Sequence, residues 1–157
     1  MTSNFTHLDE SGNAKMVDIS GKQDSVRVAV ASGLVKVNKE VIELVKDNSL
    51  PKGDLFATAR IAGIMAAKKT SELIPLCHPL SINAVEIEIK AVSEGFLIIA
   101  TVKTSGKTGV EMEALTAVSV ASLTVIDMVK AIDKTAEISE VKLLEKTGGK
   151  SGNWIRN

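Results

Sequence analysis

The sequence has one cysteine, few aromatic residues and no net charge. A single cysteine, Cys77, cannot form a disulfide within the chain, which favours a reducing compartment such as the cytoplasm. Aromatic residues make up only 3% of the chain, so few rings could stack on bases. The 19 basic and 19 acidic residues cancel, which argues against a broad nucleic-acid surface. We therefore expect a cytoplasmic protein that binds no nucleic acid.

The chain also has no clear targeting or membrane segment. The first ten residues, MTSNFTHLDE, lack the apolar core of a signal peptide. The most apolar stretch, 114–132, is about long enough to cross a bilayer. It carries Asp127, Lys130 and several small residues, which suit a buried helix better. With 157 residues, of which 45% are apolar, we expect one globular domain and no membrane contact.

Hydrophobic periodicity predicts an α+β fold. Alternating residues predict four strands, at 25–37, 82–91, 96–104 and 137–146. Helical patterns predict three helices, at 41–48, 55–70 and 110–134, with Asn38 and Asp54 as N-caps of the first two. The order is that of a ferredoxin-like βαββαβ antiparallel sheet with an additional helix. Such a sheet buries one face under its helices, so we also expect an oligomer that covers further apolar surface.

The two ends of the chain lack these patterns. Residues 1–24 predict a flexible N-terminal arm, and 147–157 a flexible tail, so we expect 1–157 to form a single domain with two loose ends. Gly63 lies among small residues of the second predicted helix, which favours close packing on a neighbour.

Two loops contain the Gly-Lys-Ser/Thr core of a phosphate-binding P-loop, SGKTG at 105–109 and GGKSG at 148–152. The full motif needs a glycine five residues before the Gly-Lys pair, where this chain has Thr101 and Leu144. Neither loop is therefore a P-loop. The first loop still precedes a predicted helix, and its free backbone N–H groups favour an anion. A solvated glycine loop is an equally good interpretation.

The segment IPLCHPL, at 74–80, places Cys77 and His78 side by side between two prolines. A zinc site needs three or four clustered ligands, and the chain has no second cysteine. Neighbours in an extended segment point to opposite faces, so a hydrogen-bonded Cys–His nucleophile is not expected either. Taken alone, the segment favours a buried cysteine and a histidine bonded to backbone, without a metal.

The predicted long helix carries a polar stripe. Five residues recur along one side of it: Glu113, Thr116, Val120, Thr124 and Asp127. Lys130 follows Asp127 by three residues on the same side. A carboxylate and an ammonium on so apolar a helix are costly to bury unless they are paired or used in catalysis. A structural ion pair and a catalytic pair both remain open. Lys52, beside Gly53, would ordinarily be a solvated lysine.

Five stretches together resemble the cyclic pyranopterin monophosphate synthase family, also called the molybdenum cofactor biosynthesis protein C family. They run from Met16 to Gly152 and are MVDIS, KGDLFATARIAGI, LIPLCHPL, SGKTGVEMEALTAVSVASLTVIDMVKAIDK and KTGGKSG. The resemblance implies a ferredoxin-like homohexamer, a trimer of dimers with active sites at dimer interfaces. It implies a lyase that converts 3′,8-cyclo-7,8-dihydro-GTP to cyclic pyranopterin monophosphate with release of pyrophosphate. No cofactor and no metal are expected.

Position by position, the resemblance also implies the site residues. The catalytic positions match Asp127, Lys130 and Lys52. The substrate-binding positions match Leu76, Cys77, His78, Met112, Glu113, Arg27 and Lys146. Asp127 beside Lys130 would supply an acid/base pair whose pKa values burial can tune. Lys52, Arg27 and Lys146 would stabilise the departing pyrophosphate.

Two other functions remain compatible with the sequence. Ferredoxin-like domains often serve as small-ligand regulatory modules, which would bind a ligand without turnover. A purely structural oligomer subunit would do neither. Incubation with the cyclised GTP intermediate and an assay for pyrophosphate distinguishes all three.

Cys77→Ser is expected to keep most of the activity, because a residue with a positional role needs no thiol chemistry. His78→Ala is expected to weaken substrate binding, because it removes the imidazole. Activity and substrate affinity of the two purified variants test this pair. Complete inactivation by the serine change would overturn the role given to Cys77.

Overall fold

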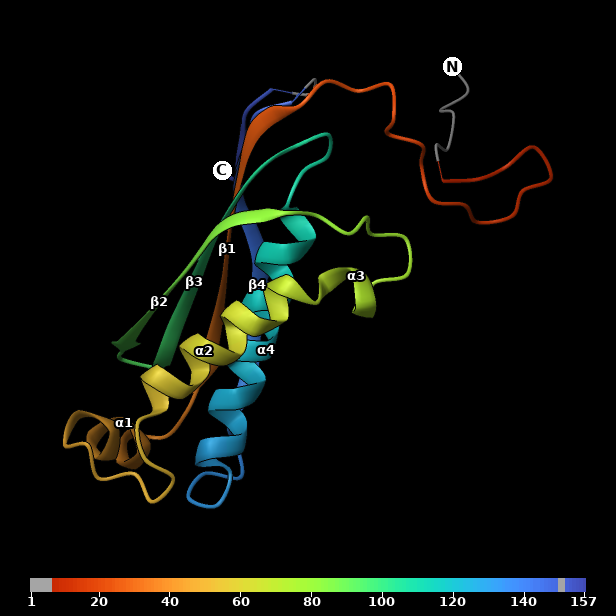
Figure 1. The fold of residues 1–157 in the computed structure, drawn as a ribbon. Coiled ribbons are helices and arrows are strands. Elements are labelled where there is room, and N and C mark those ends of the chain that lie inside the picture. Colours follow the sequence, from red (N-terminus) through yellow and green to blue (C-terminus); the bar gives the residue numbers. More distant parts are fainter. Residues whose placement is uncertain (1–6, 150–151) are drawn as a thin grey trace.

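An antiparallel sheet covered on one face by helices forms the body of the protein (Figure 1). The computed structural model describes residues 7–149 and 152–157. Within these residues the sheet order is β2-β3-β1-β4-β5. The elements in chain order are β1 Ser25–Lys36, α1 Lys39–Lys46, α2 Leu55–Lys68, α3 Thr70–Leu73, β2 Ile82–Val92, β3 Gly95–Gly106, α4 Glu111–Val129, β4 Glu137–Thr147 and β5 Trp154–Ile155.

The predicted α+β, ferredoxin-like architecture is confirmed. Strand β1 lies in the middle of the sheet, paired antiparallel with β3 on one side and β4 on the other. Strands β2 and β3 form the predicted hairpin. The alternation predicted for β2 also holds, because Ile87 and Ile89 are buried whereas Glu86 and Glu88 are exposed.

Side-chain caps fix the starts of two helices. The Asn38 Oδ1 atom accepts a hydrogen bond from the Val41 N–H at 3.0 Å, at the start of α1. The Asp54 Oδ1 atom does the same for the Ala57 N–H at 2.9 Å, at the start of α2. Each cap satisfies a backbone donor that the helix itself leaves unpaired. Both predicted caps are therefore confirmed.

Small residues let helix α4 approach its neighbours closely. A Cβ atom added to Gly33 of β1 would lie 2.6 Å from the Val118 Cγ1 atom of α4. A Cβ atom added to Gly63 of α2 would lie 3.1 Å from the Ala117 carbonyl oxygen and 3.2 Å from Ile87 Cδ1. The predicted contact at Gly63 is thus confirmed. Close packing holds α4 against both the sheet and α2.

Helix α4 ends at Val129, five residues before the predicted end. The chain turns after Val129, and the buried Asp133 carboxylate accepts hydrogen bonds from outside the helix. Its Oδ2 atom accepts from the Asn38 N–H at 2.7 Å, and its Oδ1 atom accepts from the Thr135 hydroxyl at 2.7 Å. Periodicity alone does not reveal such a tertiary contact. The short helix α3 and strand β5 were not predicted as separate elements.

The two chain ends contain little regular structure among the described residues. In the predicted arm, Leu8 and Ala14 form an isolated bridge, and the segment then runs to β1. The predicted tail includes the last residue of β4 and the two residues of β5, which pair with Glu145 and Lys146. The single-domain boundaries and the flexibility of both ends stay predictions.

Within the described residues, helix α4 is long and apolar enough to cross a bilayer by length and composition. However, 56% of its most apolar window is buried inside the fold. A core helix passes the same test, and α4 contacts α2 and three strands.

Several large apolar side chains on the helices remain exposed. Ile61 and Met65 of α2 are 57% and 54% exposed, and Leu123 of α4 is 58% exposed. Isolated exposed apolar residues are common, but three on two packed helices indicate a surface that a partner can cover.

We predict that this helical surface is covered by a second copy of the chain. Light scattering at micromolar concentration should then give a mass above that of one chain. Placing charges there with Ile61→Glu and Leu123→Glu should lower the mass, because burying a carboxylate is costly. Ile155→Glu, a change at an exposed residue of β5, is the matched control and should leave the mass unchanged. A wild-type monomer would contradict the prediction.

Candidate functional site

Asp127 forms ion pairs with both lysines that were predicted to act with it. The Lys130 Nζ atom lies 2.7 Å from Asp127 Oδ1, and the Lys52 Nζ atom lies 2.9 Å from Oδ2. Lys52 also donates to the Asp127 backbone carbonyl at 2.8 Å. Lys52 comes from the turn between α1 and α2, which lies beside the C-terminal end of α4 (Figure 1). The fold thus brings together all three predicted catalytic residues.

In the single chain, neighbouring lysines rather than burial tune the pKa of Asp127. The side chain of Asp127 is 57% exposed, and those of Lys52 and Lys130 are 45% and 61% exposed. Hydrogen bonds from Lys130 and then Lys52, reinforced by the two positive charges, lower the pKa of Asp127 from 3.8 to about 2. At neutral pH, Asp127 in this protomer is therefore a carboxylate that can accept a proton.

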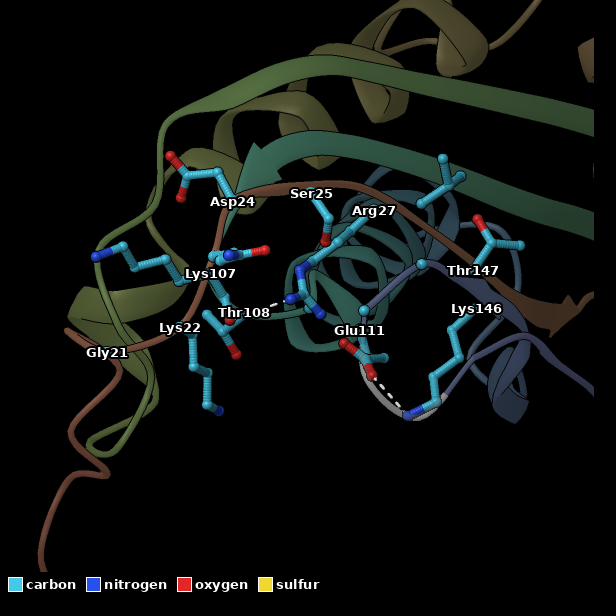
Figure 2. Close-up of a pocket in the computed structure, with 15 residues that line it drawn as sticks. Gly21, Lys22, Asp24, Ser25, Arg27, Lys107, Thr108, Glu111, Lys146 and Thr147 are labelled. Atoms are coloured by element: carbon cyan, nitrogen blue, oxygen red, sulfur yellow. Dashed lines mark hydrogen bonds and ion pairs between the residues drawn. The ribbon is translucent and has the colours of Figure 1, made fainter.

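A basic cleft of about 770 Å³ lies beside the start of α4, at the end of this helix opposite Asp127. Figure 2 shows the residues that line it. It gathers four cationic side chains and two carboxylates: Lys22, Arg27, Lys107, Lys146, Asp24 and Glu111. We call this space the basic cleft. The glycine loop before α4 contributes Thr108 and Gly109. Cations and a helix start together favour an anion there, which was one of the two interpretations that the sequence left open for this loop.

Arg27 is held in the basic cleft by backbone carbonyl groups. Its Nε atom donates to the Gly106 carbonyl at 3.0 Å, and its Nη2 atom donates to the Lys107 carbonyl at 3.2 Å. A Cβ atom on Gly149 would collide with Arg27 Nη1, so a side chain there would displace the guanidinium. Gly149 also has a φ of +78°, which favours glycine.

Lys146 is paired with Glu111 across the basic cleft. The Lys146 Nζ atom lies 3.2 Å from Glu111 Oε1, as the dashed line in Figure 2 marks. Glu111 was not predicted as a site residue. It could have been found, because it precedes Met112 and Glu113 by one and two positions at the start of the predicted helix.

A second cleft, of about 440 Å³, adjoins the first. It contains all five predicted residues from the two substrate-binding stretches: Leu76, Cys77, His78, Met112 and Glu113. We call it the His78 cleft. Lys22, Thr108, Gly109 and Glu111 line both clefts, so the two are continuous.

No hydrogen bond joins Cys77 and His78 in the described part of the chain, as expected. Residues 74–77 make a turn, in which the Cys77 N–H donates to the Ile74 carbonyl at 3.0 Å, and 77–80 belong to no helix or strand. Both residues line the His78 cleft. The His78 Nε2 atom lies 2.7 Å from the Val17 carbonyl oxygen of the arm. The predicted histidine bonded to backbone is thus confirmed.

Burial shifts the pKa values of two groups in the His78 cleft. Glu113 is only 4% exposed, and burial, with a smaller effect from the charge of Glu111, raises the pKa of its carboxyl. Burial and then the charge of Glu113 raise the pKa of the Cys77 thiol. The thiol is thus less easily ionised than usual, which does not suit a nucleophile.

The described part of the chain brings no three His, Cys, Asp or Glu side chains together as metal ligands. In the second glycine loop, Lys150 and Ser151 lie outside the described residues. Lys107 of the first loop donates from Nζ to the Ser20 carbonyl at 2.7 Å.

A single chain does not unite the ten predicted residues. About four helical turns, or about 21 Å, separate Glu113 from Asp127 along α4. Lys52, Asp127 and Lys130 thus lie at one end of α4, and the two clefts lie at the other.

The fold and the clefts define an α+β protein of ferredoxin-like type with a cleft suited to an anionic small molecule. The chain belongs to the MoaC family, whose family model matches residues 16–149. Relatives named cyclic pyranopterin monophosphate synthase include one from Streptomyces avermitilis, 60% identical over 98% of this chain and 90% of the relative. One from Streptomyces coelicolor is 59% identical over the same shares. One from Syntrophomonas wolfei is 54% identical over 98% of this chain and 99% of the relative.

Removing Lys130 or Lys52 is expected to raise the pKa of Asp127 from about 2 toward 3.8, because each lysine stabilises the carboxylate. Because the pKa of Asp127 is lower in the folded protein, its ionised carboxylate stabilises the fold above pH 3.8. This stabilisation is lost as the pH falls from 3.8 toward 2. Carboxyl ¹³C NMR titration of Lys130→Met and Lys52→Met measures the shift. Lys46→Met, which removes a surface lysine paired with Glu43, is the control. An unchanged Asp127 midpoint in both variants would contradict the assignment.

Proposed function

We propose that this chain is a cyclic pyranopterin monophosphate synthase of molybdenum cofactor biosynthesis. Its reaction would convert 3′,8-cyclo-7,8-dihydro-GTP to cyclic pyranopterin monophosphate and pyrophosphate, as a lyase in the cytoplasm. The observation that carries the proposal is the 60% identity, over 98% of the chain, to a relative with that name. Release of pyrophosphate from the cyclised GTP intermediate by the purified protein is the direct test.

The two continuous clefts suit the two parts of such a substrate. The basic cleft would take the triphosphate, because Arg27, Lys107 and Lys146 can balance its charge. The His78 cleft would take the polar heterocycle, because it offers an imidazole, a buried carboxyl group and backbone groups beside apolar walls. Lys146 would exchange its bond to Glu111 for one to the substrate.

Asp127 and its lysines would move protons during ring opening and closure. Asp127 would act first as a base, because it is ionised at neutral pH, and a substrate that displaced either lysine would raise its pKa and so strengthen it as a base. Lys130 and Lys52 each hold an ammonium within 2.9 Å of that carboxylate and could return a proton. Formation of the cyclic phosphate would join a substrate hydroxyl oxygen to the first phosphorus atom and break that atom's bond to the oxygen bridging to the second. The bridging oxygen would leave with pyrophosphate, whose charge the cations would stabilise.

A second copy of the chain would complete the site. About 21 Å along α4 is too far for Asp127 to reach a ligand held beside Glu113. A twofold-related copy would bring the Asp127 end of one α4 near the clefts of its partner. This arrangement fits the exposure of Asp127, Lys52 and Lys130 in one protomer. We propose the assembly expected of the family, a homohexamer built as a trimer of dimers.

Asp127→Asn should lower turnover by about 10²–10⁴-fold, because it removes the titrating group and keeps the side-chain shape. Thermal melting should change little, since Asp127 is exposed in the protomer. Substrate binding should also change little, because the anion is held mainly in the basic cleft. Pyrophosphate release and substrate affinity of the folded variant measure both effects. A folded and fully active Asp127→Asn protein would refute the catalytic role.

A mixture of two impaired variants, assayed at a substrate concentration too low to saturate His78→Ala, tests whether the site is shared. If Asp127 and His78 act from different subunits, co-expressed Asp127→Asn and His78→Ala chains should recover about a quarter of wild-type activity by random assembly. Neither variant alone should show it. Asp127→Asn mixed with Lys130→Met is the control, because both changes affect the same half-site. No recovery in the first mixture would place the site within one subunit.

A further inference from the structure

Residues 17–22 of the N-terminal arm form a wall common to the two clefts. Val17 and Ile19 line the His78 cleft, Gly21 lines the basic cleft, and Lys22 lines both. This part of the arm therefore contributes to the site, although none of the predicted site residues lies in it. We call residues 17–20 the arm turn.

Two carbonyl groups of the arm turn hold two polar side chains of the clefts. The Val17 carbonyl oxygen lies 2.7 Å from His78 Nε2, and the Ser20 carbonyl accepts from Lys107 Nζ at 2.7 Å. A carbonyl oxygen can only accept, so His78 Nε2 must carry a hydrogen. In the neutral ring, Nδ1 is then the acceptor that remains for a ligand.

Asp18 holds the arm turn in shape. Its Oδ1 atom accepts a hydrogen bond from the Ser20 N–H at 2.8 Å, an interaction typical of an Asx turn. That bond is also the main reason why the pKa of Asp18 is lowered, with smaller effects from the charges of Lys107 and His78. Asp18 lies between the residues whose carbonyls bind His78 and Lys107, so its turn sets the spacing of those carbonyls.

We propose that Asp18 is a positioning residue that, through the arm turn, fixes His78 as its Nε2–H tautomer and orients Lys107. Asp18 lines neither cleft, and it acts on a ligand only through these two side chains. The effect comes from the shape of the turn. The kinetic test of this proposal rests on the proposed function, whereas the tautomer of His78 can be measured without it.

Substitutions at Asp18 separate the turn from the charge. Asn keeps an oxygen that can accept from the Ser20 N–H, whereas Ala removes the acceptor. Asp18→Asn should therefore behave like the wild type, and Asp18→Ala should not. Asp9→Ala is a matched control, because Asp9 also binds backbone N–H groups in the arm, at Ser11 and Asn13, but lines neither cleft.

Nitrogen-15 NMR of the imidazole rings reports the tautomer directly, at a pH where His78 is neutral. The chain has two histidines, and His7→Gln identifies the His78 signals. The wild type, Asp18→Asn and Asp9→Ala should show the Nε2–H tautomer, and Asp18→Ala should show a mixture of both. An unchanged tautomer in Asp18→Ala, or a mixture in Asp18→Asn, would overturn the proposal.

Steady-state kinetics provide the second measurement. Losing one positioned hydrogen bond should raise the KM of Asp18→Ala by roughly 3–10-fold, with kcat changed less. Asp18→Asn should restore the wild-type KM. An equal rise in both variants would show that charge matters instead and would contradict the proposal. A wild-type protein without activity would refute the proposed function and leave the NMR result to decide on Asp18.

Discussion

The close packing of α4 is the constraint on which the rest of the structure depends. Gly33 of β1 and Gly63 of α2 leave room for α4 where any side chain would meet Val118 or the Ala117 carbonyl. The helix is therefore fixed against the sheet along its length. It begins between the two clefts and ends at Asp127 and Lys130, so its length sets how far apart the two groups of polar residues lie.

Two carboxyl groups on this helix have opposite environments. Burial raises the pKa of Glu113, whereas Lys130 and Lys52 lower the pKa of Asp127. One helix thus carries a group that holds its proton more tightly than usual and a group that stays ionised. Two carboxyl groups whose pKa values are shifted in opposite directions suit different roles in proton transfer. The difference comes from their neighbours, since the two side chains differ by one methylene.

Much of the fold could be predicted from local patterns. Alternation located β1 to β4, and Asn38 and Asp54 marked the helix starts, because these signals act over a few residues. The end of α4 was misplaced, since the contacts of Asp133 join segments distant in sequence. The exposure of Asp127 was also missed. An apolar helix sequence does not say which of its sides faces water.

The sequence by itself determined which residues are proposed to carry the chemistry and which of them share a helical face. It placed Lys130 three residues after Asp127, and this spacing alone allows their ion pair. Only the tertiary structure decided that Lys52 completes the pair and that arm carbonyls bind His78 and Lys107. The physical reason is that every residue except proline carries the same backbone donor and acceptor. Which carbonyl meets which side chain therefore depends on the path of the folded chain.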